Sequence, residues 1–278
     1  MPTQSEKAAA FQALHQRPQP FVIANPSDAG TARILTALGF QALSTTSAGL
    51  AFTLGRRDGD GSVSRDEALA NARSIVAATT LPVAADLENG YGHSPEAAAE
   101  TIRLAAEAGL VGGSIEDASG DPASPIYDFQ HAVERIHAAA AAAHALPFPF
   151  MLVARAENFL HGRPDLDDTI RRLQAFEAVG AEVLYAPGIT RADDIRAVCA
   201  SVAKPVNVLM GIKGVPPLSV RDLGALGVRR VSIGSGFARA GLTAFLHAAR
   251  EVRDHGTFTF TEETLYMSEL VDLFEPHG

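Results

Sequence analysis

The chain has little cysteine, no long apolar run and no basic stripe, and each absence excludes a class of protein. The single cysteine, Cys199, excludes an internal disulfide framework and indicates a reducing compartment such as the cytoplasm. No run of about 18 apolar residues is present, and the opening segment lacks the apolar core of a signal peptide, so we expect no membrane insertion. A formal net charge of -9 makes nucleic acid and anionic membranes poor partners.

The apolar residues, 47% of the 278, fall into short runs that alternate with helical segments. Strict alternation of this kind predicts parallel strands with helices outside, and eight such units predict a closed (β/α)8 TIM barrel of the α/β class. No linker separates domains, so we expect one domain over 1–278, with an N-terminal helix over 3–16 and a C-terminal helical tail over 261–274. The predicted strands cover 20–25, 42–49, 82–87, 112–117, 150–157, 181–187, 205–210 and 229–235.

The ends of the predicted helices carry suitable capping residues. Ser64, Ser94 and Thr190 stand where side-chain N-caps belong, and Gly109 and Gly180 stand just beyond two helix ends. The strands are apolar on both faces, and polar residues gather after them. That edge of a TIM barrel carries the active site in essentially every enzyme with this fold.

Three carboxylates follow neighbouring predicted strands. Asp86 ends the third strand, Glu88 lies two residues further on, and Glu116 ends the fourth strand. Clustered carboxylates raise one another's pKa values unless a cation is present, and oxygen ligands suit a hard ion such as Mg²⁺. The three residues therefore predict a metal site. The alternative is helix capping or ion pairing, for which the neighbouring Asp117 is the best candidate.

A lone arginine, Arg155, ends the fifth predicted strand. A guanidinium at that position can clamp a substrate carboxylate through two hydrogen bonds. The alternative is a structural ion pair with Glu157 or Glu116. We favour the substrate-binding role, because a buried arginine at the end of a barrel strand is costly unless it is used.

Three further regions supply candidates for substrate binding. The small residues Ser47, Ala48 and Gly49 allow backbone amides to approach a ligand oxygen. Asp58 lies on the loop that follows, either as an acid on a lid or as part of a solvated turn. Asn207 is an amide within an apolar strand, where it either binds substrate from the barrel lumen or satisfies a buried backbone group.

The remaining reactive residues carry weaker indications. His93 and His161 lie in loops and are predicted to be solvated, and Cys199 lies within a predicted outer helix as an inert thiol. The glycine-rich stretches 210–214 and 233–236 follow the seventh and eighth strands. Loops there bind phosphate in many barrels, which leaves an enzyme of phosphorylated metabolites as a rival prediction.

Six segments resemble one known family in content and order. They are TSAGLA, GRRDG, AADLENGYG, GGSIED, LVARAE and GAEVLYAPG, and they are similar to the isocitrate lyase / phosphoenolpyruvate mutase superfamily. The resemblance covers nearly the whole chain. It implies a Mg²⁺-dependent (β/α)8 barrel that makes or breaks C–C or P–C bonds next to an oxo-acid. It also implies a homo-oligomer, a dimer or tetramer, in which the last barrel helix is swapped between partners.

The resemblance implies a role for each acid of the predicted metal site. Asp86 would ligate Mg²⁺, with Mn²⁺ as an alternative ion, and Glu88 and Glu116 would hold the ion mostly through water. The metal would chelate a small 2-oxo carboxylate. Glu116 is also counted among the predicted catalytic residues.

The same resemblance implies the contacts to substrate. Ser47, Ala48 and Gly49 would bind the substrate carboxylate or carbonyl. Arg155 would stabilise an enolate or the second acid group, and Asp58 would lie on the gating side. Arg155 and Asp58 therefore complete the predicted catalytic set.

The chain departs from the family where the family carries its acid–base residue. Lyases of the family have a cysteine-containing run directly after I-E-D, and phosphonate-handling members have a lysine and an asparagine there. This chain reads IEDASGDPASPIYD and has Pro187 after the sixth strand. We therefore expect a Mg²⁺-dependent lyase or decarboxylase of a small 2-oxo di-acid such as oxaloacetate. The alternatives are phosphonopyruvate hydrolase or mutase chemistry, and a non-catalytic binder of a 2-oxo acid such as 2-oxoglutarate.

Overall fold

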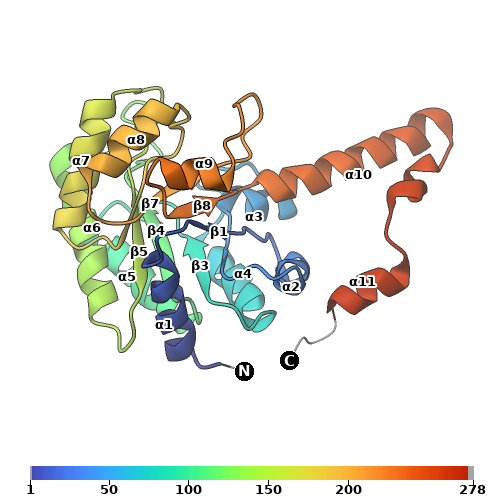
Figure 1. The fold of residues 1–278 in the computed structure, drawn as a ribbon, viewed down its shortest axis with the longest axis horizontal. Helices are drawn as coiled ribbons and strands as arrows, with labels where there is room; N and C mark the ends of the chain where they lie inside the picture. Colours follow the sequence, from blue (N-terminus) through green and yellow to red (C-terminus); the bar gives the residue numbers. More distant parts are fainter. Residues whose placement is uncertain (1, 275–278) are drawn as a thin grey trace.

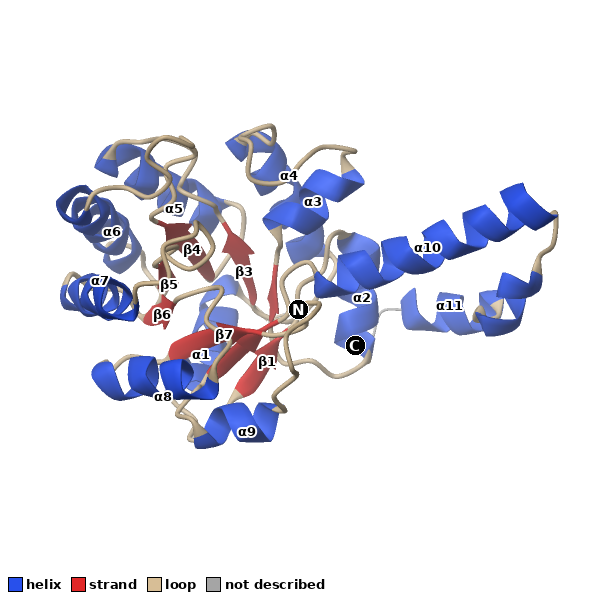
Figure 2. Cartoon of the chain, turned by 90° about the horizontal axis from the view of Figure 1, so that it is seen from above, coloured by secondary structure: helices blue, strands red, loops and turns tan. Residues whose placement is uncertain are grey.

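The computed structural model describes residues 2–274, in which eight parallel strands form one nearly closed barrel. The strand order is β1-β8-β7-β6-β5-β4-β3-β2, and β1 meets β2 through a single bridge between Ala24 and Leu43. Figure 2 shows the strands surrounded by helices. The predicted TIM barrel is confirmed. The strands are β1 (Phe21–Ile23), β2 (Leu43–Ser44), β3 (Val83–Asp86), β4 (Gly112–Glu116), β5 (Met151–Arg155), β6 (Val183–Tyr185), β7 (Val206–Leu209) and β8 (Arg230–Ser232).

The helices follow the strands as the sequence predicts. Ser64 and Ser94 accept hydrogen bonds from Glu67 N and Ala97 N at the starts of their helices. Thr190 is not an N-cap, because its helix begins one residue later, after Arg191, without a side-chain cap. The helices are α1 (Gln4–His15), α2 (Ala29–Ala37), α3 (Ser47–Thr53), α4 (Arg65–Ala77), α5 (Pro95–Glu107), α6 (Phe129–His144), α7 (Leu166–Ala178), α8 (Ala192–Ser201), α9 (Val220–Ala225), α10 (Gly236–His255) and α11 (Met267–Phe274), with a 3₁₀ turn, η1 (Thr259–Glu263), between the last two.

One helix was not expected from the sequence. The segment predicted as a strand and loop over 42–49 is a two-residue strand followed directly by α3. Thr46 caps α3 by accepting a hydrogen bond from Gly49 N. The amides at the start of α3 therefore lie at the carboxyl end of β2, on the edge of the barrel where the candidate residues gather.

The bottom of the barrel is closed by α1. Phe11 is fully buried in the lumen and meets His15 and Phe21 edge-on, at ring centroid distances of 4.7 and 6.4 Å. A Cβ added at Gly112 of β4 would lie 2.9 Å from the ring of Phe11, so the strand and the plug pack in direct contact. The lumen is thus solid at this end, and the opposite end remains for a site.

Beyond its first turns, α10 does not pack on its own barrel. None of the residues of α10 is buried, and Figure 1 shows α10 extending away from the strands before η1 and α11 run back. α11 contacts α2, where Arg33 Nη1 donates to the carbonyl of Phe274 at 3.0 Å. None of the helices within residues 2–274 is both long and apolar enough to cross a membrane.

Replacing Phe11 by alanine should lower the free energy of unfolding by about 3–5 kcal/mol, because it leaves a cavity where the lumen is closed. Leu54→Ala removes a side chain that is 41% exposed and serves as the control. Chemical denaturation at one fixed protein concentration measures both. Equal losses in the two variants would contradict the plug assigned to α1.

Candidate active site

A cavity of about 950 Å³ lies among the loops after β2, β3, β4 and β5. The carboxyl ends of these strands are where the sequence predicts the site. The structure brings most of the predicted residues together there. Its wall includes Ser47, Asp58, Glu88, Glu116 and Arg155.

Arg155 is the centre of the site. Its guanidinium pairs with Asp86 at 2.9 Å, with Glu116 at 2.9 Å and with Glu157 at 2.8 Å. Its Cζ lies 5.4 Å from the ring centroid of Tyr185. Burial alone would disfavour the charge, but the surrounding carboxylates raise the pKa of Arg155 well above its ordinary value. Arg155 therefore forms the structural ion pairs that were the alternative, and the same side chain is the one predicted to bind substrate.

Asp86 is fixed by neighbours on both sides. The amide of Ser47, at the start of α3, donates to Oδ2 at 3.2 Å, and the hydroxyl of Ser114 on β4 lies 3.5 Å from Oδ1. The backbone amide of Asp86 in turn donates to Thr45 Oγ1 at 3.0 Å. One of its carboxylate oxygens faces Arg155 and the other faces α3, so the side chain bridges the two parts of the site.

Glu88 is the carboxylate without a partner. Its backbone is left-handed, with φ of 47°, and its side chain makes no hydrogen bond or ion pair within residues 2–274. Burial, together with Asp86 and Asp58, raises the pKa of Glu88 to about 7. Burial also raises the pKa of Glu116 well above its ordinary value despite Arg155. The site holds more negative charge than one guanidinium neutralises.

The donors suit a hard cation, although no ready-made cage is present. Within the part of the chain that the structure describes, no three His, Cys, Asp or Glu side chains are close enough to hold a metal ion. Arg155 takes the space between Asp86 and Glu116, which explains why. The available ligands are carboxylate oxygens, the type that Mg²⁺ prefers, usually with several waters retained.

The predicted substrate-binding residues after β2 divide into two groups. Ser47 lines the cavity, and its hydroxyl hydrogen-bonds Asp58, whose pKa is raised by burial and by Asp86. Gly49 instead lines a separate apolar groove, and a Cβ there would meet Ser27 Oγ at 2.6 Å. The glycine is explained by close packing. Ala48 lines neither hollow.

Asn207 lies apart from the cavity. It is 2% exposed within the lumen, and its Nδ2 donates to Ser232 Oγ at 3.0 Å. It is not among the residues of the cavity wall. The side-chain pair does not support a buried backbone group, and Oδ1 of Asn207 is buried without a partner among the described residues. Substrate binding by Asn207 stays a prediction.

Asp117 belongs to a buried ion-pair network, which is the alternative role that the sequence predicts for it. It is 1% exposed, pairs with Arg172 at 2.9 Å and accepts from the amide of Glu157 at 2.8 Å. Burial raises its pKa to about 6. Arg172 also pairs with Asp168 at 2.9 Å, so this network ties the ends of β4 and β5 to α7.

Two amides of the rival phosphate site, in the stretch after β8, are not available to a phosphate. The amides of Ile233 and Gly234, which would face a phosphate after β8, both donate to Asn25 Oδ1 at 2.9 Å. Those donors are therefore already satisfied.

Cys199 is half-buried in α8, where burial raises its pKa to about 11, as expected of an inert thiol.

The sequence reasoning missed the floor of the site. Tyr185 lies beneath Arg155 and is paired with it in register between β5 and β6. Alternation along β6 would place Tyr185 and Val183 on the lumen side, but only if the register were known. Tyr91, with φ of 57°, also lines the cavity, and nothing in the sequence indicates its left-handed backbone.

The (β/α)8 barrel and the acidic cluster at the carboxyl ends of its strands agree with the resemblance to the isocitrate lyase / phosphoenolpyruvate mutase superfamily. The chain belongs to this superfamily: the family model described as phosphoenolpyruvate phosphomutase matches residues 11–253. The match covers the whole barrel and most of α10. The resemblance stated from the sequence is thereby confirmed.

Three known proteins illustrate the relationship. A Burkholderia cenocepacia protein named for a lyase or mutase activity is 57% identical, with a TM-score of 0.95 over 99% of this chain and 97% of its own. The 2-methylisocitrate lyase of Escherichia coli is 30% identical over 77% of this chain and 73% of its own. An oxaloacetate acetylhydrolase, solved with its product oxalate, is 25% identical with a TM-score of 0.87, over 98% and 94%.

The Asp168 side chain gives the network beside the site a pH dependence. Burial acts to raise its pKa, but hydrogen bonds from Arg172, Arg171 and Asn158 outweigh burial and lower the pKa to about 2. A carboxylate with a lowered pKa stabilises the fold above its unfolded pKa of about 3.9 and loses that effect as the pH falls through about 2.

Asp168→Asn should therefore lower the free energy of unfolding at pH 7 by about 1 kcal/mol, a value discounted for partial exposure. The difference from wild type should shrink as the pH falls below about 4. Asp193→Asn, in a surface pair with Arg196, is the control and should show little effect at any pH. Denaturation at several pH values measures all three proteins. A difference that grows in acid would contradict the assignment.

Proposed function

We propose that this protein is a Mg²⁺-dependent lyase that cleaves a C–C bond next to a small 2-oxo acid, with oxaloacetate as the representative substrate. The observation that carries the proposal is the cluster of buried carboxylates that converge on Arg155 beside the unpartnered Glu88. An additional cation would stabilise such a cluster, because it offsets the repulsion among the carboxylates. A small di-acid fits a cavity of this size.

Asp86, Glu88 and Glu116 are the residues that would hold the ion. Asp86 keeps a carboxylate oxygen whose one contact is the long bond from Ser47 N, at 3.2 Å, and Glu88 is unpartnered. When bound, Mg²⁺ would act as a Lewis acid on the substrate's oxygens. Binding of a divalent ion would also remove the repulsion that raises the pKa of Glu88.

The protein's own contribution is positioning and charge. Arg155 remains protonated and lies against the ring of Tyr185. It therefore presents a fixed positive charge in a site shielded from bulk water. Charge that develops on a substrate oxygen next to Arg155 is stabilised more strongly than it would be in water. The amide of Ser47 donates to Asp86 and so fixes that carboxylate beside Arg155.

Two relatives support a C–C bond rather than a P–C bond as the target. The 2-methylisocitrate lyase and the oxaloacetate acetylhydrolase both take their names from reactions at 2-oxo or hydroxy acids. The segment after Glu116 lacks the lysine and asparagine expected of phosphonate chemistry. Phosphonopyruvate hydrolase chemistry and non-catalytic binding of 2-oxoglutarate remain as outcomes of the test.

The direct test is a substrate panel with purified protein and Mg²⁺. Oxaloacetate, 2-methylisocitrate, 2,3-dimethylmalate and phosphonopyruvate are each incubated, and pyruvate and phosphate are followed. We expect pyruvate from one of the first three and loss of that activity in Asp86→Asn, because the metal site loses its central carboxylate. Asp121→Asn alters an exposed carboxylate on the same cavity wall and should keep the activity.

Other outcomes contradict the proposal in distinct ways. Phosphate release from phosphonopyruvate would favour the hydrolase. Calorimetric binding of 2-oxoglutarate without any product would favour a sensor. Unchanged activity in Asp86→Asn, or activity that persists in EDTA, would refute the assigned site.

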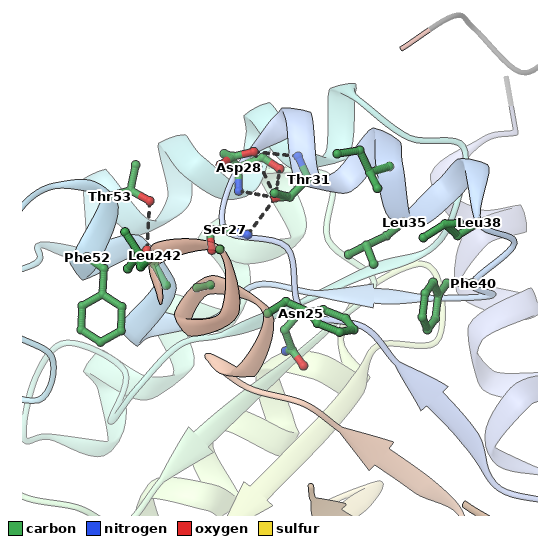
Figure 3. Close-up of a pocket in the computed structure, with 15 residues that line it drawn as sticks. Asn25, Ser27, Asp28, Thr31, Leu35, Leu38, Phe40, Phe52, Thr53 and Leu242 are labelled. Atoms are coloured by element: carbon green, nitrogen blue, oxygen red, sulfur yellow. Dashed lines mark hydrogen bonds between the residues drawn. The ribbon is translucent and has the colours of Figure 1, made fainter. Parts of the chain in front are cut away.

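The assembly forms a second part of the proposal. We infer that α10 packs on the barrel of a second copy, as the family resemblance implies. Phe245 is 73% exposed on α10, and Leu242 is 48% exposed. Figure 3 shows Leu242 beside an apolar groove of about 500 Å³ that also contains Leu35 and Leu38 of α2 and its end. The exposed side chains of α10 and the leucines of the groove are both apolar.

Replacing Phe245 by glutamate should shift the protein toward monomer in light scattering after size exclusion, because a charge would enter an apolar interface. The control is Arg250→Glu, at an exposed position on the same helix. The neighbouring Glu251 is left unchanged, because it makes hydrogen bonds within its own chain to the segment after α10. A wild-type protein that is monomeric at all concentrations would contradict the exchange of α10.

A further inference from the structure

The candidate site lacks a proton donor on the loop where the family resemblance places one. The loop from Ala118 to Tyr127 contributes Ser119, Gly120 and Asp121 to the cavity wall and no thiol, amine or imidazole. Cleavage that leaves an enolate still requires a proton on carbon. Two imidazoles line the same wall, His93 after β3 and His161 after β5.

Only His93 is oriented by a second side chain. Its Nδ1 lies 2.8 Å from the hydroxyl of Tyr127, and the two rings meet edge-on with centroids 6.0 Å apart. The ring of His161 makes no hydrogen bond within residues 2–274; only its backbone amide does, to Glu157 O. With Nδ1 taken by Tyr127, the reactive nitrogen of His93 is Nε2.

The backbone around His93 is held at three successive carbonyls by α6. Arg135 Nη1 donates to both flanking carbonyls, to Gly92 O at 2.7 Å and to Ser94 O at 3.1 Å. The carbonyl of His93 itself lies 2.8 Å from Nε2 of His131. The side chain of His93 is exposed, as the sequence predicts, but the backbone that carries it is fixed at three successive residues.

The side chain of Arg135, which holds this loop, is buried. Arg135 is 1% exposed, and its Cζ lies 4.6 Å from the ring centroid of Tyr127. It also donates to the carbonyl of Asn89, at the start of the same loop. A buried arginine with only carbonyls and an aromatic face as partners is costly to keep. Arg135 therefore positions both His93 and the tyrosine that orients it.

The other polar groups of the wall are less suited to carry the proton. The pKa of Tyr91 is raised well above its ordinary value by burial and by Glu88. Arg155 does not release a proton. Glu88 is one of the residues that would hold the ion. An imidazole changes charge near neutral pH and is the most common general acid in enzymes.

We propose that His93 is the residue that protonates the enolate carbon, with Tyr127 and Arg135 as positioning residues. This inference rests on the proposed function. The C–C bond breaks, CO₂ leaves in the case of oxaloacetate, and the bonding electron pair stays on the enolate carbon. The Nε2–H bond of the imidazolium then breaks as the new C–H bond of pyruvate forms. Water at the cavity mouth returns a proton to the imidazole.

The test follows the same proton in reverse. Wild-type protein with Mg²⁺ and pyruvate in D₂O should exchange the methyl hydrogens of pyruvate, which proton NMR detects without any C–C cleavage. His93→Gln should slow this exchange by about 10²-fold or more. It should still bind Mg²⁺ and oxalate, a planar mimic of the enolate, with wild-type affinity by calorimetry. Tyr127→Phe should fall between the two, because it keeps the ring over Arg135 and loses the hydroxyl.

His161→Gln is the matched control, since it removes the other imidazole of the wall and should leave exchange unchanged. Wild-type exchange in His93→Gln, or loss of exchange in His161→Gln, would overturn the role of His93 and leave the proposed function intact. Decarboxylation of oxaloacetate by a wild type that cannot exchange pyruvate would also overturn it, because the enol would then be protonated in water. A wild type that neither cleaves the panel nor exchanges pyruvate would refute the proposed function itself.

Discussion

Three carboxylates from different parts of the barrel converge on the guanidinium of Arg155, and the rest of the site depends on that convergence. The sheet register pairs Glu116 of β4 with Arg155 of β5, and Asp86 reaches the same guanidinium from β3. Without Arg155 these acids would repel one another in a partly buried place. With it, the protein keeps an excess of negative charge at the mouth of the barrel, which is the condition for recruiting a divalent cation.

The loops around this cluster are held by a second layer of buried ion pairs and hydrogen bonds. Asp117 and Arg172 fix the ends of β4 and β5 to α7, while Arg135 fixes the loop after β3 to α6. Both arginines are buried and donate to groups inside the protein, although Nε of Arg135 has no partner among the described residues. The loops that carry reactive groups are consequently anchored on the outer helices, and their shape does not depend on the strands alone.

The sequence predicts the barrel almost completely, because apolar strands and capped helices are encoded by neighbouring residues. It also predicts that Asp86, Glu116 and Arg155 meet, since strand ends in a parallel barrel share one edge. It does not predict α3, whose Thr46 cap looks like part of a strand, or the packing against Ser27 that explains Gly49. Those features depend on contacts between segments far apart in the chain, as do the partner of Asn207 and the absence of a cap at Thr190.

The distribution of reactive groups over separate loops explains how a shared barrel can support different reactions. The carboxylates proposed to hold the metal and the arginine they pair with lie at the strand ends, where a change would disturb the register and the pairs of Arg155. The proposed proton donor lies on a loop, and the loop after β4 is a short turn of small residues closed by hydrogen bonds between Ser119 and Ser124–Pro125. Such a turn leaves the cavity open to a group from the neighbouring loop. In the proposed reaction, the carboxylates at the strand ends and the loop that supplies the proton are therefore separate parts of the site, and the loop after β3 is the one that buried side chains hold in place.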